Sequence, residues 1–272
     1  MIKNKLTTSS FLFYLIFCNY VSAENSFDLK PVLLDSESSN STILGLEYLY
    51  EGSKTINSGL TEIDSEDASD EIDPDETINI VDIEYFLKGT VTSRSDKNPK
   101  SFLDSKLSIS YLWSDSFSFK SKAFVGYESD QSFDDKQLKY GLSTSMAKID
   151  VFRPNNILAF SLNIDQVDPI KDEAREAVLG EDLETYNRID LEFLYIYNLG
   201  FKNVDTLEFG YRYFREINAK ELIKQENLDI FKTATYRIGF KRNFYVAYST
   251  GELPFNQKDN RIYEIGFSYK FD

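Results

Sequence analysis

The sequence predicts an all-β protein: an antiparallel, up-and-down transmembrane β-barrel of twelve strands, with ten strands as the alternative. Apolar and polar residues alternate with a period of two along repeated segments, each about as long as the roughly 9–11 residues that a tilted strand needs to cross a bilayer. Aromatic residues make up 15% of the 272 residues, which favours strands with aromatic girdles. Beyond residue 23 no apolar run approaches the roughly 20 residues of a membrane-spanning helix.

The first 23 residues are expected to be a signal peptide that directs secretion. Lys3 and Lys5 precede a short apolar run at 11–17, and small residues end the segment at Ala23. Cleavage there would leave residues 24–272 as the barrel. Cys18 is the only cysteine, so the mature chain would hold no disulfide.

The alternation places the strands of the barrel in chain order. Strands are expected near 27–36, 42–51, 78–92, 101–113, 117–128, 136–148, 156–166, 185–198, 204–216, 229–241, 243–250 and 261–271. The first of them contains Pro31, which donates no hydrogen bond to a ladder and therefore belongs near an end or an irregularity. The cleanest alternation is in 78–92, 185–198 and 204–216, where each apolar face is opposed by a charged one.

The connections between these strands predict two unlike ends. Long, charged connections at 129–135, 167–184, 217–228 and 251–260 are expected outside the cell, and short ones at 114–116, 199–203 and 241–243 in the periplasm. Residues 168–184 have a weak apolar side that suggests a short helix, either in an ordinary surface loop or folded inward as a constriction.

One connection breaks this pattern. Residues 52–77 are rich in Ser, Asp and Glu and fall on the side where short turns are expected. We interpret them as a flexible, solvated periplasmic insert, unless the first strands are misassigned. A divalent-cation or basic-partner site is the other interpretation, but the spacing of an EF-hand and its glycine are missing.

The final strand carries a recognisable motif. Between 261 and 271 every second residue is apolar, and the pattern Glu264-x-Gly266-x-x-Tyr269-x-Phe271 resembles the C-terminal β-signal of bacterial outer-membrane barrels. The extra residue Asp272 departs from that pattern, in which an aromatic usually ends the chain. The resemblance implies a bacterial outer-membrane location, outer-membrane lipid as surroundings, and assembly by the barrel-insertion machinery through Gly266, Tyr269 and Phe271.

Several function classes are disfavoured by composition. A formal net charge of −15 without a basic tract argues against a nucleic-acid partner. The chain has no His, whereas the phospholipase, lipid A deacylase, omptin and palmitoyltransferase types of barrel enzyme use one. We therefore expect no enzyme, no catalytic residue, no metal site and no cofactor.

The charged residues on the inward-facing positions are the candidate functional residues. Those expected to line the lumen are Asp82, Glu84, Lys88, Lys106, Lys120, Lys122, Arg188, Asp190, Glu192, Glu208, Arg212 and Arg237. Asp104, Lys139, Asp165, Glu264 and Lys270 share the same face. Such residues favour a narrow channel or transport protein for small polar solutes or ions. The alternative is a non-conducting structural barrel that binds a periplasmic or surface protein through its loops and acidic insert.

Overall fold

The computed structural model describes residues 24–36, 41–58, 79–93, 98, 100–114, 118–180, 183–201 and 203–271. The expected signal peptide and most of the acidic insert lie outside these residues. The strands are β1 (Glu24–Ser36), β2 (Ser41–Ser58), β3 (Asn79–Thr92), β4 (Leu103–Ser114), β5 (Ser118–Ser129), β6 (Lys136–Ile149), β7 (Ile157–Lys171), β8 (Tyr186–Asn198), β9 (Val204–Ile217), β10 (Ile230–Phe240), β11 (Phe244–Leu253), β12 (Asn256–Phe267) and β13 (Tyr269–Phe271).

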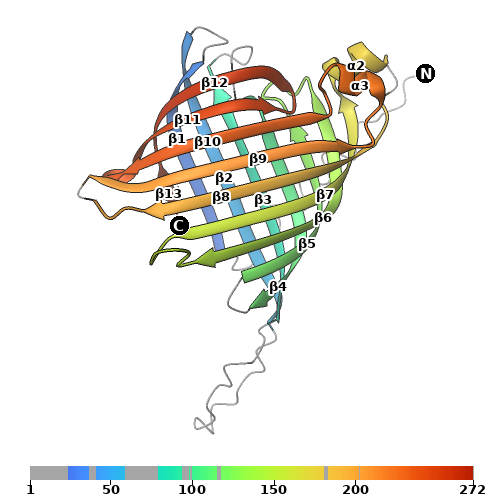
Figure 1. The fold of residues 1–272 in the computed structure, drawn as a ribbon. Coiled ribbons are helices and arrows are strands. Elements are labelled where there is room, and N and C mark those ends of the chain that lie inside the picture. The colour runs from blue at the N-terminus through green and yellow to red at the C-terminus, as the bar shows by residue number, and fades with distance from the viewer. Residues whose placement is uncertain are drawn as a thin grey trace.

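The strands close into a single antiparallel barrel, as Figure 1 shows. Each strand pairs with its neighbour in sequence, and β1 pairs with both β12 and β13. These last two segments are the two parts of one wall strand, interrupted at Ser268. The predicted twelve-stranded up-and-down barrel is thereby confirmed.

Pro31 lies at the closure of the barrel. Residues 27–29 of β1 pair with β13, and residues 32–36 pair with β12. Pro31 falls in the gap between these two ladders, next to the interruption at Ser268, and is paired with Leu46 of β2 on its other side. The expected placement of this proline at an irregularity is confirmed.

Several expected boundaries differ from the structure. β7 continues through Lys171, so residues 167–171 of the expected loop belong to a strand. β2 continues through Ser58, so residues 52–58 of the expected insert belong to a strand. The expected long loop at 251–260 is wrong, because β11 and β12 extend into it and leave a two-residue connection at Pro254 and Phe255. The ladder accommodates this tight hairpin through a register shift after Gly251, whose φ of 117° suits glycine.

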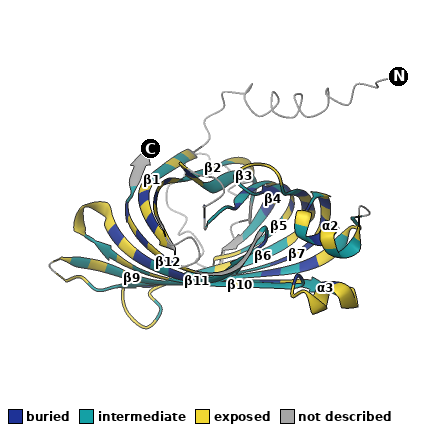
Figure 2. Ribbon diagram, turned by 90° about the horizontal axis from the view of Figure 1, so that it is seen from above, coloured by how far each residue is buried: buried dark blue, intermediate teal, exposed yellow. Residues whose placement is uncertain are grey.

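The two ends of the barrel carry different connections. We call the end with connections 93–102, 130–135, 172–185 and 218–229 the loop side, and the end with 150–156, 199–203 and 241–243 the turn side. The predicted short helix is present as α2 (Glu173–Leu179). It lies at the loop-side rim beside α3 (Glu221–Gln225), as Figures 1 and 2 show, and α3 was not predicted.

The two helices pack against each other over a small apolar cluster. Ala219, Ile223 and Leu228 are buried there against Ala174 and Val178. Asp172 caps the start of α2 by accepting a hydrogen bond from the backbone N–H of Arg175 at 3.0 Å. No helix in the described part of the chain is long and apolar enough to span a membrane.

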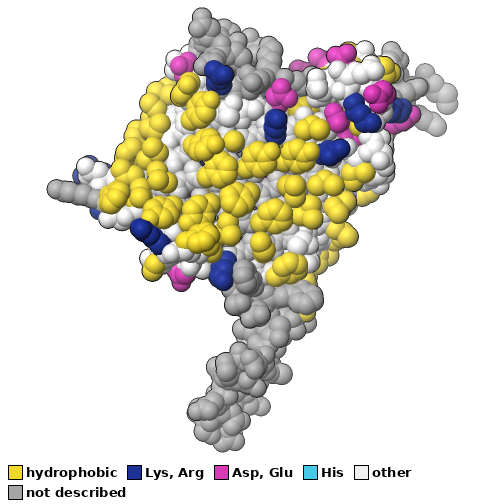
Figure 3. Space-filling view, viewed as in Figure 1, with side chains coloured by type: hydrophobic (Ala, Val, Ile, Leu, Met, Phe, Trp, Pro, Cys, Tyr) yellow, Lys and Arg dark blue, Asp and Glu magenta, His cyan; other side chains and the backbone are white. Residues whose placement is uncertain are grey.

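The outer surface of the barrel is apolar. Leu107, Ile109, Leu142, Tyr236 and Ile265 are among the large apolar side chains that point outward and remain exposed. On the face shown in Figure 3, hydrophobic side chains merge into a broad band, and charged side chains gather above it near the helices. Such a band is the surface that a barrel presents to lipid.

A row of aromatic rings crosses this outer face from β8 to β12. It consists of Phe193, Phe209, Tyr236, Tyr248 and Tyr263, whose successive ring centroids are 5.1–6.5 Å apart. Neighbouring rings on adjacent strands stabilise the pairing of those strands. The row confirms that the alternating apolar positions of these strands face away from the interior.

Candidate functional site: the charged interior

The polar face of the strands points into the barrel. Ion pairs form between strands that are not neighbours in the wall, such as Lys88 on β3 with Glu192 on β8, at 3.7 Å. Arg188 on β8 likewise reaches Glu128 on β5 at 2.9 Å. Contacts of this kind can form only across the interior.

A tight ion network occupies part of the interior near the loop side. Lys139 donates to Asp104 at 2.6 Å and also to Glu128. Arg188 donates to both oxygens of Glu128, at 2.9 and 3.0 Å, and to Asp165 at 2.7 Å. All five side chains are almost completely buried. We call these five residues the loop-side network; each of its charges has an opposite charge in contact, which burial requires.

A glycine makes room for the central lysine of this network. Gly126 on β5 is paired with Lys139 on β6. A Cβ at Gly126 would come within 2.8 Å of the Cε atom of Lys139. The missing side chain therefore allows the lysine stem to lie across the strand and reach its two carboxylates.

Arg212 connects this network with the middle of the barrel. Its guanidinium contacts Asp190 at 2.8 Å, Glu192 at 2.7 Å and Asp104 at 3.4 Å. The same group lies 4.3 Å from the ring centre of Phe214, a buried residue on β9. The ring fixes the guanidinium plane while the three acids compensate its charge.

A different arrangement is found near the turn side. Glu84 on β3 accepts hydrogen bonds from Lys120 and Lys122 on β5, the latter at 2.6 Å, and from Ser110 at 2.8 Å. We call Glu84, Lys120 and Lys122 the turn-side triad. One carboxylate here serves two ammonium groups, and all three side chains keep some solvent exposure.

The remaining candidates lie on the same inner face in smaller groups. Asp82 accepts a hydrogen bond from Thr55 at 2.7 Å. Lys106 lies over the rings of Phe86 and Phe124, 5.6 and 4.9 Å from their centres. Arg237 is 3.4 Å from Glu208 and lies over the ring of Tyr245.

The loop before β4 inserts a further cation into the interior. Lys100 donates to Glu47 on β2 at 2.7 Å and to Glu264 on β12. Burial by itself would lower the pKa of Lys100, but the two carboxylates outweigh it and raise the pKa above its ordinary value. Lys100 is thus charged and ties this loop to two wall strands.

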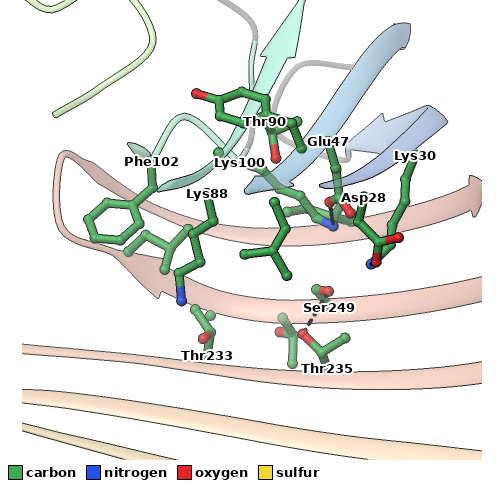
Figure 4. A pocket seen from close by; sticks show the side chains of 17 residues that line it. Asp28, Lys30, Glu47, Lys88, Thr90, Lys100, Phe102, Thr233, Thr235 and Ser249 are labelled. Carbon is green, nitrogen blue, oxygen red and sulfur yellow. Dashed lines mark hydrogen bonds and ion pairs between the residues drawn. The ribbon is translucent and has the colours of Figure 1, made fainter. Parts of the chain in front are cut away.

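Two cavities lie between these groups. The loop-side cavity, about 340 Å³, is lined by residues that include Asp28, Lys30, Glu47, Lys100 and Phe102, and Figure 4 shows it. The turn-side cavity, about 590 Å³, is lined by residues that include Lys120, Lys122, Ser145, Ser161, Glu192 and Arg212. Lys88, Thr233 and Thr235 line both cavities, which therefore lie next to each other at these three residues.

Sequence reasoning missed several charged residues of the interior, including Asp28 and Lys30 in the loop-side cavity, Glu128, Glu47 and Lys100. Glu128 continues the inward row formed by Lys120 and Lys122 along β5, so the alternation alone could have found it. Glu47 occupies an inward position of β2 in the same way. Lys100 lies in an aperiodic connection, where no periodic signal exists.

The residues of the C-terminal motif take part in closure. Tyr269 and Phe271 pair with Leu29 and Phe27 through the backbone; their side chains and that of Lys270 lie outside the described side chains. Gly266 faces inward beneath the ring of Tyr245, where a Cβ would clash. Because the ring lies over this glycine, the Tyr245 hydroxyl reaches and donates to Glu264.

Within the described residues no group of three or more His, Cys, Asp or Glu side chains is arranged to hold a metal ion. No family model and no curated protein matches the sequence. Solved structures with a similar fold include the porin NanC, which is 10% identical with a TM-score of 0.50 and matches 89% of this chain and 100% of its own. The outer-membrane protein OmpT of Vibrio cholerae is 8% identical with a TM-score of 0.44, over 92% of this chain and 99% of its own.

At such identities the likeness to NanC concerns the fold alone. The fold is that of bacterial outer-membrane β-barrels, to which this porin belongs. Location in a bacterial outer membrane follows from this fold together with the apolar outer band. The outer-membrane location expected from the C-terminal motif is thereby confirmed.

Proposed function

We propose that the protein is a narrow, passive channel for small polar solutes or ions. The observation that carries the proposal is that Lys88, Thr233 and Thr235 line both interior cavities. One cavity lies toward the loop side and the other toward the turn side, and in a channel their shared lining, which we call the junction, would join them into a polar route along the barrel. Charged and hydroxyl groups along such a route replace part of the hydration of a passing solute.

A non-conducting barrel is the second candidate, and a specific observation favours it. The loop-side network and the Lys100 tether occupy the interior near the loop side with buried ion pairs. Barrels of this size lie between the filled eight-stranded type and the open porins of 16–18 strands. In that case the loops at the rim would bind a partner, and the interior would serve stability.

Single-channel recording in a planar lipid bilayer tests the channel. The purified mature chain, refolded and inserted, is expected to give discrete steps of small, reproducible conductance. Heat-dependent migration in SDS gels establishes that the protein is folded. A silent membrane with folded, inserted protein would contradict the channel and support the second candidate.

A matched pair of tryptophan variants sharpens this test. Thr235 lines both cavities, and its hydroxyl lies 3.0 Å from that of Ser249 across the same inner face. Thr235→Trp should lower the conductance by at least about half, because the indole fills the junction. Its neighbour Ala234 points outward on β10, so Ala234→Trp should leave the conductance unchanged. Equal conductance in the two variants would place the route elsewhere.

A further inference from the structure

The charges that line the turn-side cavity are mostly positive. Lys88, Lys120, Lys122 and Arg212 contribute four cations to its lining, and Glu192 contributes the one acid. They come from β3, β5, β8 and β9, so they surround the space from several sides. The loop-side cavity differs, because Asp28 and Glu47 stand beside its cations in the lining itself.

The acids that balance the turn-side cations lie behind them. In the turn-side triad the Lys120 and Lys122 side chains are 26% and 28% exposed, whereas that of Glu84 is 15% exposed. Glu84 is not part of the lining. Asp82, the next acid on β3, is buried and directed to Thr55 on the far side from β5. An entering solute therefore meets the ammonium groups first.

Arg212 shows the same layering. Two of its partners, Asp104 and Asp190, are almost completely buried, while the Arg212 side chain is 12% exposed and the residue lines the cavity. Lys88 is the exception, since it and Glu192 are equally exposed at 3.7 Å. Lys106 adds a further positive charge nearby on the same inner face, over the rings of Phe86 and Phe124.

We infer that the turn-side cavity is a selectivity site for small organic anions that carry carboxylate or phosphate groups. This inference rests on the proposed channel and names the solute class for it. Ammonium groups at Lys120 and Lys122 supply charge-assisted hydrogen bonds to anionic oxygens, and Arg212 adds a guanidinium. A volume of about 590 Å³ is ample for a small metabolite-sized anion. Ser145 and Ser161 in the lining add hydroxyl groups for its neutral oxygens.

Reversal potentials in a gradient of potassium chloride measure this selectivity directly. The wild-type protein should pass chloride in preference to potassium. The variant Lys120→Gln with Lys122→Gln should reduce the permeability ratio at least about two-fold, since it removes both exposed ammonium groups. Glu84→Gln should shift the ratio in the opposite direction, because both lysines lose their shared counter-charge.

An exterior lysine provides the control. Lys232 is exposed on β10, on the outward face beside inward Thr233, so Lys232→Gln removes the same charge outside the cavity. Its permeability ratio should equal that of the wild type. Heat-dependent migration in SDS gels verifies the fold of each variant.

Citrate is the probe for organic anions. Added on both sides of the membrane, it should reduce the chloride current of the wild type and do so less in the double lysine variant. Channels that conduct but prefer potassium would overturn the inference about anions. A permeability ratio that stays the same in the triad variants would also overturn it. Either result would still support the proposed channel. A silent membrane would overturn the channel and this inference together.

Discussion

The loop-side network and the turn-side triad are built from the same residue types on the same inner face, yet their environments differ. In the network, Lys139 and Arg188 are buried against three carboxylates, and each acid contacts at least one of the two cations. In the triad, two lysines share Glu84 and border a cavity. In a buried ion pair each charge needs its partner, so stability depends on the pair, whereas a partly exposed pair contributes little to stability and can still interact with a solute.

Lys139→Met should produce the largest effect on stability. The substitution leaves Asp104 and Glu128 without their shared ammonium group in a buried site. Removing one partner of a buried ion pair costs about 3–5 kcal/mol of the free energy of unfolding. Urea unfolding in detergent micelles or liposomes measures this loss.

The triad supplies the matched control for that substitution. Lys122→Met removes the same group from a partly exposed site and should cost less than about 1 kcal/mol. Similar losses of unfolding free energy in the two variants would show that burial does not distinguish the network from the triad.

Arg212→Gln should have an intermediate effect, because Arg212 lies between the network and the turn-side cavity. It contacts buried Asp104 and Asp190 on one side and lines the turn-side cavity on the other. Loss of its charge-assisted hydrogen bonds should cost about 1.5–3 kcal/mol. The same variant should also lower the permeability ratio of chloride to potassium. A change in stability with an unaltered ratio would assign Arg212 to the network alone.

The sequence predicted the barrel and its inner face because both follow from a period of two. Once a strand such as β8 is located, Arg188, Asp190 and Glu192 must share one face. A different local rule, the missing backbone N–H of proline, placed Pro31 near an irregularity of the ladder before the closure was visible. The C-terminal motif added the location in the outer membrane.

The division of the inner face into network and triad could not be predicted. Arg188 and Glu128 are 60 residues apart, on strands separated by two others, and meet only because the closed barrel brings them together. Lys100 reaches the interior from an aperiodic connection. The tight β11–β12 hairpin was missed because the polar residues near 256–260 resemble a loop although they form a strand.

A smaller, local effect is expected at the rim, where an acid has other acids as neighbours. Asp135 lies between β5 and β6 and accepts a hydrogen bond from the backbone N–H of Glu173 at 2.8 Å. Burial, together with the charges of Asp172, Asp130 and Glu173, raises the pKa of Asp135 from an ordinary 3.8 to about 6. In contrast to the acids of the network, this one binds a proton more tightly in the folded protein than in the unfolded chain.

The sign of the resulting pH dependence follows from linkage. Between pH 3.8 and about 6 the folded state binds more protons than the unfolded state, so the contribution of Asp135 to the stability of the folded rim is full below pH 3.8 and falls as the pH rises through 6. The amide of Glu173, at the start of α2, should therefore exchange with solvent faster above pH 6 than below it, after correction for intrinsic exchange rates. Asp135→Asn keeps a side-chain oxygen for the amide but cannot ionise, and it should remove this step. If Asp135→Asn shows a step of the same size, the step belongs to another titrating group. If NMR titration of the Asp135 carboxyl gives a midpoint near 4, cations at the rim compensate the charge of this acid, as Lys139 and Arg188 compensate the acids of the network.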